Sequence, residues 1–279
     1  MTAANTSPAN QSKGGGFGAI FPYIIIPVLF VLAIVVYKYV FGAPSNFPGG
    51  DLSKDPVPEP ALNHYLGVVY KGGFVVPILL TLLFTVIVFV FERFITLSKA
   101  TGTANVDTFV RTIKSHLDKE DFAGAVKACD KQKGAVASVV RAGLTKYQEM
   151  LTTSGMEKED KVMAIQKEVE EATSLELPML EKNLNILATI ASVATLMGLF
   201  GTVLGMIRAF GALATAGAPD SSALATGISE ALINTALGIG SSAIAIIFYN
   251  FFTGRIDALT YRIDEAGYSL TQTYATKGK

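Results

Sequence analysis

The chain has 279 residues and a formal net charge of +0, and half of its residues are hydrophobic while only 16% are charged, with a mean hydropathy of +0.42. Soluble domains are usually about 25% charged, so this composition argues against an ordinary soluble protein, and the balanced charge argues against a nucleic-acid partner. The single cysteine, Cys129, excludes an internal disulfide.

Four apolar runs without a charged residue follow one another along the chain: Phe17–Tyr37, Gly72–Phe91, Leu184–Ile207 and Ala231–Phe252. A helix needs about 20 apolar residues to cross a bilayer, and each run meets that length. We therefore predict an all-α, polytopic helical membrane protein with four transmembrane helices. The first run is longer than the apolar part of a signal peptide and no clear cleavage site follows it, so we expect it to be retained.

The predicted segments divide the chain as follows: a flexible N-terminal tail (1–16), a first transmembrane helix (17–42), an outer loop (43–71), a transmembrane helix (72–97), a cytoplasmic helical domain (98–183), a transmembrane helix (184–210), a short outer loop (211–222), a transmembrane helix (223–253) and a cytoplasmic C-terminal helix and tail (254–279). The prolines and glycines of the first outer loop predict an irregular, exposed segment.

The cytoplasmic domain has the apolar spacing of amphipathic helices. Three short helices are predicted over 105–117, 120–132 and 134–151, with Asp107 and Asp121 at helix N-termini. A long helix is predicted over 157–187, running into the third span, with Pro178 as a candidate for a kink. The C-terminal tail is expected to begin as a charged helix and to end frayed.

Lysines and arginines set the orientation, because cytoplasmic loops are enriched in them. They are numerous over 98–183, and Arg255 and Arg262 follow the last span, whereas residues 211–222 contain none. Both termini are therefore predicted to be cytoplasmic. Arg93 and Lys99, at the end of the second span, are expected to meet lipid headgroups.

Polar and small residues form a face on each of the last two spans. On the fourth, Thr226, Glu230, Asn234 and Ser241 share one sector, and Ala231, Thr235, Gly238 and Ser242 form an adjacent stripe. On the third, Ala188, Ser192, Thr195, Gly198, Thr202 and Gly205 recur at helical spacing.

A charged side chain at bilayer depth costs about 2.5–3.5 kcal/mol, so Glu230 is expected to face protein or water. We interpret Thr202, Thr235, Glu230 and Asn234 as lining a proton pathway, and Gly198, Gly201, Gly205 and Gly238 as helix-packing positions. The alternative for Glu230 is a carboxylate at a helix start near the outer interface. For the two threonines it is helix packing or hydrogen bonding to their own helix.

Two motifs within these spans carry a family resemblance. Gly198–Val203 reads GLFGTV and Gly227–Leu232 reads GISEAL, with Thr235 shortly after and Tyr249–Asn250 at the end. This pattern resembles the MotA/TolQ/ExbB proton-channel family, most of all ExbB and TolQ. The resemblance is strong over 181–267, moderate over the second span and the cytoplasmic helices, and absent over 1–70.

The resemblance implies a pentamer in the bacterial inner membrane whose pore holds a dimer of a single-pass ExbD/TolR-type protein. Proton flow past an intramembrane aspartate of that partner would drive a motion passed to TonB or TolA. Thr202 and Thr235 would then face the aspartate and Glu230 would lie in the same lining, while the outer loops would be periplasmic. The helix over 17–42 is extra to the usual three-pass plan, and the family's common prolines are replaced at Thr195 and near Ala245.

Other functions have less support in the sequence. There is no Walker A motif and no metal-ligand spacing, and His64 and His116 stand far apart. We therefore expect no enzyme activity, no cofactor, no metal and no nucleic-acid partner. Within the family, a TonB-linked subunit, a TolQ-like subunit and a flagellar or gliding stator remain alternatives, and a non-channel scaffold is the alternative outside it.

Overall fold

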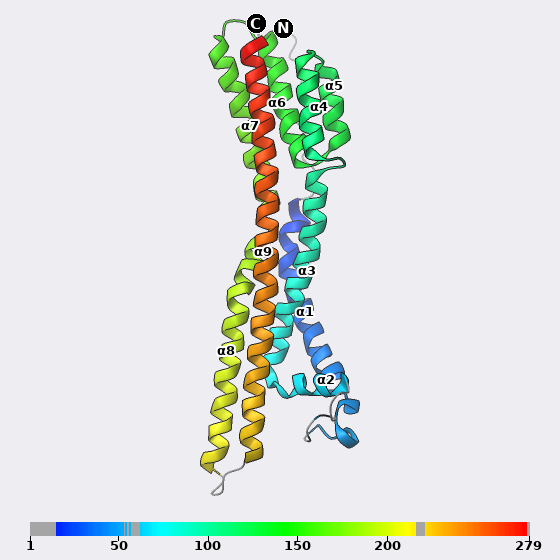
Figure 1. Ribbon diagram of the computed structural model, residues 1–279, viewed down its shortest axis with the longest axis vertical. Helices are drawn as coiled ribbons and strands as arrows, with labels where there is room; N and C mark the ends of the chain where they lie inside the picture. The colour runs from blue at the N-terminus through cyan, green and yellow to red at the C-terminus, as the bar shows by residue number, and fades with distance from the viewer. Residues whose placement is uncertain (1–14, 53, 55, 57–61, 216–220, 278–279) are drawn as a thin grey trace. The chain divides into compact units, whose positions relative to one another are not determined.

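The structure is a computed structural model that describes residues 15–52, 54, 56, 62–215 and 221–277. The chain divides into two compact units: unit 1 contains residues up to Ile87 and Ile190–Ile244, and unit 2 contains Val88–Thr189 and the residues from Ala245 onward. Most of the predicted N-terminal tail and the centre of the short loop at 211–222 lie outside the described residues. The helices labelled in Figure 1 are α1 (Gly15–Val36), α2 (Leu62–Lys71), α3 (Val76–Thr101), α4 (Val106–Asp118), α5 (Phe122–Gln132), α6 (Gly134–Thr152), α7 (Lys158–Glu181), α8 (Leu184–Thr215) and α9 (Ser221–Lys277).

Four described helical segments are long and apolar enough to cross a membrane: Ile20–Phe41, Gly73–Asp118, Lys158–Ala214 and Ser221–Lys277. Each contains one of the four predicted apolar runs or most of it. The predicted all-α membrane protein with four apolar helices is therefore confirmed.

Three local predictions were wrong. Residues Leu62–Lys71, placed in an irregular loop, form α2, because the prolines that disfavour a helix all precede this stretch. The long helix expected over 157–187 breaks after Glu181, where Asn183 takes a positive φ of 66° that ends α7. The tail does not fray before Lys277, since α9 is one helix of 57 residues.

Unit 1 is held together by apolar contacts and by side chains that bind backbone carbonyls. Ala33 of α1 packs with Val76 and Leu80 of α3. Tyr37, in a π-helical turn that follows α1, donates to the Tyr70 carbonyl oxygen (3.0 Å). Asn46 donates to the last carbonyls of that turn, Val40 (2.7 Å) and Phe41 (2.8 Å). These contacts fix the segment between α1 and α3.

Unit 2 has a core of apolar side chains from α4, α5, α6, α7 and α9. Close approach of three helices depends on Gly143, where an added Cβ would lie 2.8 Å from Val169 and 3.0 Å from Leu270. The Tyr274 hydroxyl of α9 donates to the Met150 carbonyl oxygen of α6 (2.9 Å). The C-terminal part of α9 is therefore a core element of this unit.

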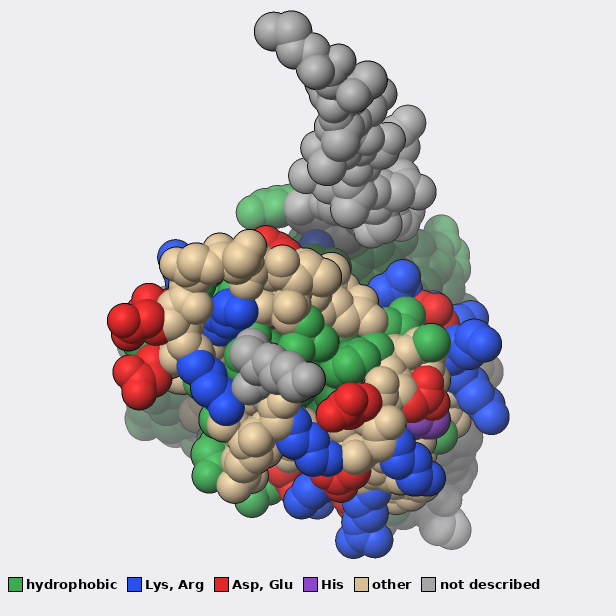
Figure 2. Space-filling model, turned by 90° about the horizontal axis from the view of Figure 1, so that it is seen from above, with side chains coloured by type: hydrophobic (Ala, Val, Ile, Leu, Met, Phe, Trp, Pro, Cys, Tyr) green, Lys and Arg blue, Asp and Glu red, His purple; other side chains and the backbone are tan. Residues whose placement is uncertain are grey.

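Charges of both signs are interspersed on the outside of unit 2. On the face shown in Figure 2, Lys and Arg side chains lie among Asp and Glu side chains. Ion pairs such as Arg262 with Asp107 (2.7 Å) and Lys277 with Asp118 (3.6 Å) connect α9 to α4. This mixed surface agrees with the neutral composition.

Candidate functional site

In unit 1, α8 and α9 lie side by side (Figure 1) and approach each other through glycines. A Cβ added to Gly201 would lie 2.5 Å from the Asn234 Cβ, and one added to Gly238 would lie 2.7 Å from the Gly198 Cα. A Cβ on Gly205 would lie 2.8 Å from the Gly227 carbonyl oxygen. All four predicted packing glycines thus lie at the contact, where a larger residue would force the two backbones apart.

Thr202 of α8 and Thr235 of α9 meet at this contact. Their Oγ1 atoms are hydrogen-bonded to each other, and both side chains are half-buried. The Thr202 hydroxyl also lies 3.3 Å from the Ala231 carbonyl oxygen, and the Thr235 hydroxyl lies 3.2 Å from the same oxygen. Since each hydroxyl has one proton and two acceptor sites, the pair keeps acceptor capacity for a further donor at its exposed side.

Other polar groups extend along the same two helices. Ser192 and Thr195 of α8 are exposed. Ser242 of α9 is half-buried and donates to the Ala191 carbonyl oxygen of α8. The polar stripes predicted on the two spans therefore include residues next to the contact and residues open to the surroundings of the chain.

Glu230 precedes Thr235 on α9, and it is only 6% exposed. Its carboxylate is paired with Arg208 of α8, whose guanidinium lies 5.4 Å from the centre of the Phe74 ring. An added Cβ at Gly73 would meet the same carboxylate, so the backbone before α3 closes the site on that side.

Arg208 was not identified from the sequence as a site residue, and its ion pair was missed. A signal was available: α8 ends at Thr215 and α9 begins at Ser221, so Arg208 and Glu230 are separated by similar numbers of residues from the ends of two antiparallel helices that face each other. Counting outward from the loop would have placed them at the same depth.

Asn234 is completely buried (0% exposed) rather than open at a surface of the chain. Its Nδ2 donates to the Gly72 carbonyl oxygen (2.9 Å), which connects α9 to the segment that precedes α3. Its Oδ1 is buried without a hydrogen-bond partner among the described residues. The amide therefore anchors the α8–α9 pair to the entry of α3.

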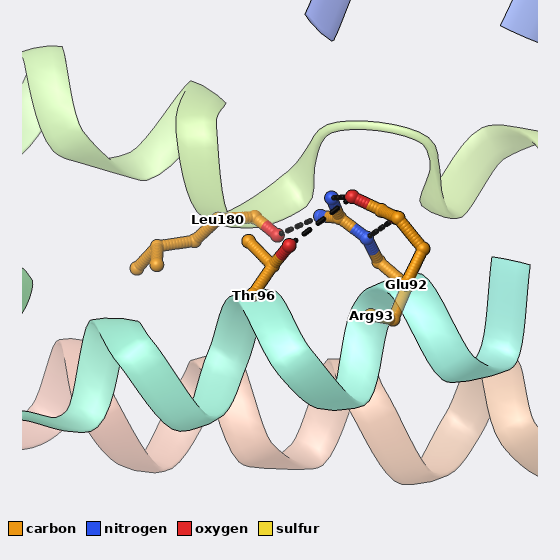
Figure 3. A network of polar contacts seen from close by, with 4 residues as sticks. All are labelled: Glu92, Arg93, Thr96 and Leu180. Carbon is orange, nitrogen blue, oxygen red and sulfur yellow. Dashed lines mark hydrogen bonds and ion pairs between the residues drawn. The ribbon is translucent and has the colours of Figure 1, made fainter. Parts of the chain in front are cut away.

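Unit 2 contains a second buried polar network, drawn in Figure 3, at the end of the apolar part of α3. Arg93 is 1% exposed; its Nε and Nη2 donate to the Glu92 carboxylate (2.6 and 2.5 Å) and its Nη1 donates to the Leu180 carbonyl oxygen (3.1 Å). Thr96 donates to the same carboxylate (3.1 Å). The expectation that Arg93 meets lipid headgroups was wrong, because its guanidinium satisfies a carbonyl in the last turn of α7 just before the break at Asn183.

Among the residues that the structure describes, no group of three or more His, Cys, Asp and Glu is placed to hold a metal ion. His116 pairs with Asp121 (2.9 Å) on the outside of unit 2.

Comparison with known proteins gives matches over the same part of the chain. The model of the MotA/TolQ/ExbB proton channel family matches residues 131–265. The Tol-Pal system protein TolQ of Pseudomonas aeruginosa is 31% identical over 157 residues, which are 56% of this chain and 68% of that protein.

Two further relatives match shorter parts. TolQ of Haemophilus influenzae is 42% identical over 88 residues, 32% of this chain and 39% of that protein. The biopolymer transport protein ExbB of Pseudomonas putida is 38% identical over 81 residues, 29% of this chain and 25% of that protein. The chain thus matches about two thirds of the first relative and less than half of the other two.

Proposed function

Because this chain belongs to the MotA/TolQ/ExbB proton channel family, we propose that it is the proton-conducting subunit of an ExbB/ExbD-type motor in the bacterial inner membrane. The motor would use the proton motive force to energise TonB-dependent transport across the outer membrane. Both termini of the chain would then lie in the cytoplasm.

The observation that carries this proposal is the half-buried hydroxyl pair of Thr202 and Thr235 between two apolar helices. Packing alone does not require two hydroxyls at one contact, since α8 and α9 already approach each other through glycines. A hydroxyl both donates and accepts hydrogen bonds, and as a neutral group it does not trap an additional proton. The pair can therefore form hydrogen bonds with a water molecule or a protonated carboxyl group that approaches from outside the chain.

Glu230 has a different part in this scheme. Its carboxylate is paired with the Arg208 guanidinium near the outer end of the α8–α9 contact. We assign Glu230 to the proton pathway at that end. Asn234, which is completely buried, supports this lining from behind: its amide anchors α9 to the Gly72 carbonyl.

The site supports an oligomer, and membership of the family supports the proposed partners. The hydroxyl pair of Thr202 and Thr235 in one chain is half-buried and cannot surround a water-filled path by itself. We propose a homo-oligomer, a pentamer, with a single-pass ExbD/TolR-type protein in its centre and TonB or TolA as the protein that receives the motion.

A TolQ-like subunit of the Tol-Pal envelope system is the second candidate. It is favoured by the length of the match to P. aeruginosa TolQ, which is nearly twice that of the match to P. putida ExbB (157 against 81 residues). Complementation decides between the two: an ExbB-type subunit restores TonB-dependent uptake to a strain lacking its own ExbB, and a TolQ-type subunit restores envelope integrity to a strain lacking TolQ.

The proton-channel proposal is tested by the double substitution Thr202→Val and Thr235→Val, which keeps side-chain shape and removes both hydroxyls. We expect proton flux and coupled transport to be lost while the complex with the single-pass partner still assembles. The matched control is Thr253→Val, because among the described residues the Thr253 hydroxyl bonds only to the Tyr249 carbonyl of its own helix (3.0 Å). Normal proton flux in the double variant would refute the proposed pathway.

A further inference from the structure

A cavity of about 570 Å³ lies within unit 2, between the end of α3, the start of α4 and α9. Its size is within the range of sites that hold small organic ligands, about 300–1,000 Å³. None of the candidate proton-path residues lines it. Its chemistry changes along α9, from aromatic at Phe251 to basic at Arg255 and Arg262.

The lower part of the cavity is an aromatic cluster at the end of the apolar spans. The Phe94 ring of α3 lies 5.6 Å from the Phe251 ring and 5.0 Å from the Phe252 ring. Phe94 and Phe251 are each 42% exposed, so they present apolar surface to the cavity and to whatever surrounds the helix pair. Both residues belong to the predicted transmembrane segments, where the surroundings are acyl chains.

Arg255 stands immediately above this cluster, one turn of α9 beyond Phe251. Its guanidinium lies 5.4 Å from the centre of the Phe251 ring, which directs the charge over the cavity floor. Arg255 is exposed and has no ion-pair partner in the described part of the chain. Arg262 lines the cavity as well, but its charge is already balanced by Asp107 (2.7 Å) and Glu265 (2.8 Å).

We propose that this cavity, called here the α3–α9 groove, binds an anionic membrane phospholipid. Its phosphate group would lie at Arg255, and the part of an acyl chain nearest the headgroup would lie against Phe94 and Phe251. An arginine without a carboxylate partner is a site for a phosphate group. Basic pockets between transmembrane helices are a recurrent form of lipid recognition. Ser98, Thr101 and Asn105 also line the groove and supply polar groups above the aromatic floor.

The test uses tryptophan fluorescence, because the chain contains no tryptophan. Phe251→Trp places one fluorophore at the groove and keeps an aromatic face for Arg255. Phe91→Trp is the matched control, because Phe91 is 65% exposed on α3 and does not line the groove. The full-length variants are reconstituted in vesicles of phosphatidylcholine with brominated phosphatidylglycerol or brominated phosphatidylcholine as the quencher.

In the Phe251→Trp variant, we expect brominated phosphatidylglycerol to bind the groove about fivefold better than brominated phosphatidylcholine. This ratio is the effect of one arginine on the binding of anionic lipid near a membrane surface. In the Phe91→Trp variant the two lipids are expected to quench equally. Adding Arg255→Gln to Phe251→Trp should abolish the preference, and adding Lys99→Gln should retain it, because Lys99 is a basic residue of α3 outside the groove.

Three results would overturn the proposal. The first is equal quenching by both lipids at the groove. The second is a phosphatidylglycerol preference that survives Arg255→Gln. The third is quenching at the Phe91 position with none at the groove, which would mean that a protein surface, such as a second copy of this chain, covers it.

Discussion

Replacing Arg208 with glutamine leaves the Glu230 carboxylate without its cation. The Glu230 side chain is 8% exposed and the Arg208 side chain is 48% exposed. A buried carboxylate without a partner is strongly destabilising, whereas the half-exposed guanidinium can be hydrated when its partner is removed. The two single substitutions should therefore have unequal effects.

The burial of the two partners sets the magnitude. Exposed ion pairs contribute about 0.2–1 kcal/mol, and removing one partner of a fully buried pair costs about 3–5 kcal/mol. With one partner buried and the other half-exposed, we expect Arg208→Gln to lower the free energy of unfolding by about 2 kcal/mol. Glu230→Gln should cost about 1 kcal/mol, and the double variant should cost about 1.5 kcal/mol, less than the sum of the two.

The assay is a double-mutant cycle in which unfolding in mixed detergent micelles is followed by circular dichroism. The control cycle uses Arg141 and Asp130, an ion pair of unit 2 in which both side chains are about half-exposed (56% and 51%). We expect a coupling energy of about 1.5 kcal/mol for Arg208 and Glu230 and under about 1 kcal/mol for the control. Additive single effects at Arg208 and Glu230 would refute the inference that these two residues stabilise each other.

Two further predictions concern packing and burial. Gly201→Ala should destabilise unit 1 by about 1–2 kcal/mol, since the added Cβ would lie 2.5 Å from the Asn234 Cβ. The control, Gly211→Ala in the same helix, places a Cβ with nothing within 4 Å and should be neutral or stabilising. Equal shifts of the melting temperature in the two variants would contradict this prediction. Burial raises the pKa of the Cys129 thiol to about 12, so the stability that the neutral buried thiol gives the fold is complete below about pH 9 and is lost as the pH rises toward 12. At about pH 8, maleimide should label Cys129 roughly a hundredfold more slowly in the folded protein than in detergent-unfolded protein. Similar labelling rates would contradict the burial of the thiol.

Much of the fold was predictable because the signals are local. Apolar runs of about 20 residues identify membrane-crossing helices by length alone, and the spacing over 105–151 predicted α4, α5 and α6 closely. Asp121 is the N-cap of α5, where its carboxylate accepts from the Gly124 amide (2.9 Å). Asn105 caps α4 in the same way, and the predicted Asp107 lies in the first turn of that helix.

The breaks between helices were less predictable because they depend on single backbone conformations. Asn183 has no proline or glycine beside it, and its positive φ interrupts a sequence whose periodicity continues into α8. Leu62–Lys71 was assigned to a loop because of prolines that belong to the preceding residues.

For the site, the sequence by itself determined which residues are polar or small on the last two apolar spans, since side-chain spacing along a helix is a property of the chain alone. It therefore indicated the contact glycines, Thr202, Thr235 and Glu230. Only the tertiary structure decided their partners: Thr235 for Thr202, Arg208 for Glu230, the Gly72 carbonyl for Asn234. The physical reason is that burying a polar group in an apolar setting requires a hydrogen-bond or ionic partner from another part of the chain, and which part supplies it depends on how the chain folds back on itself.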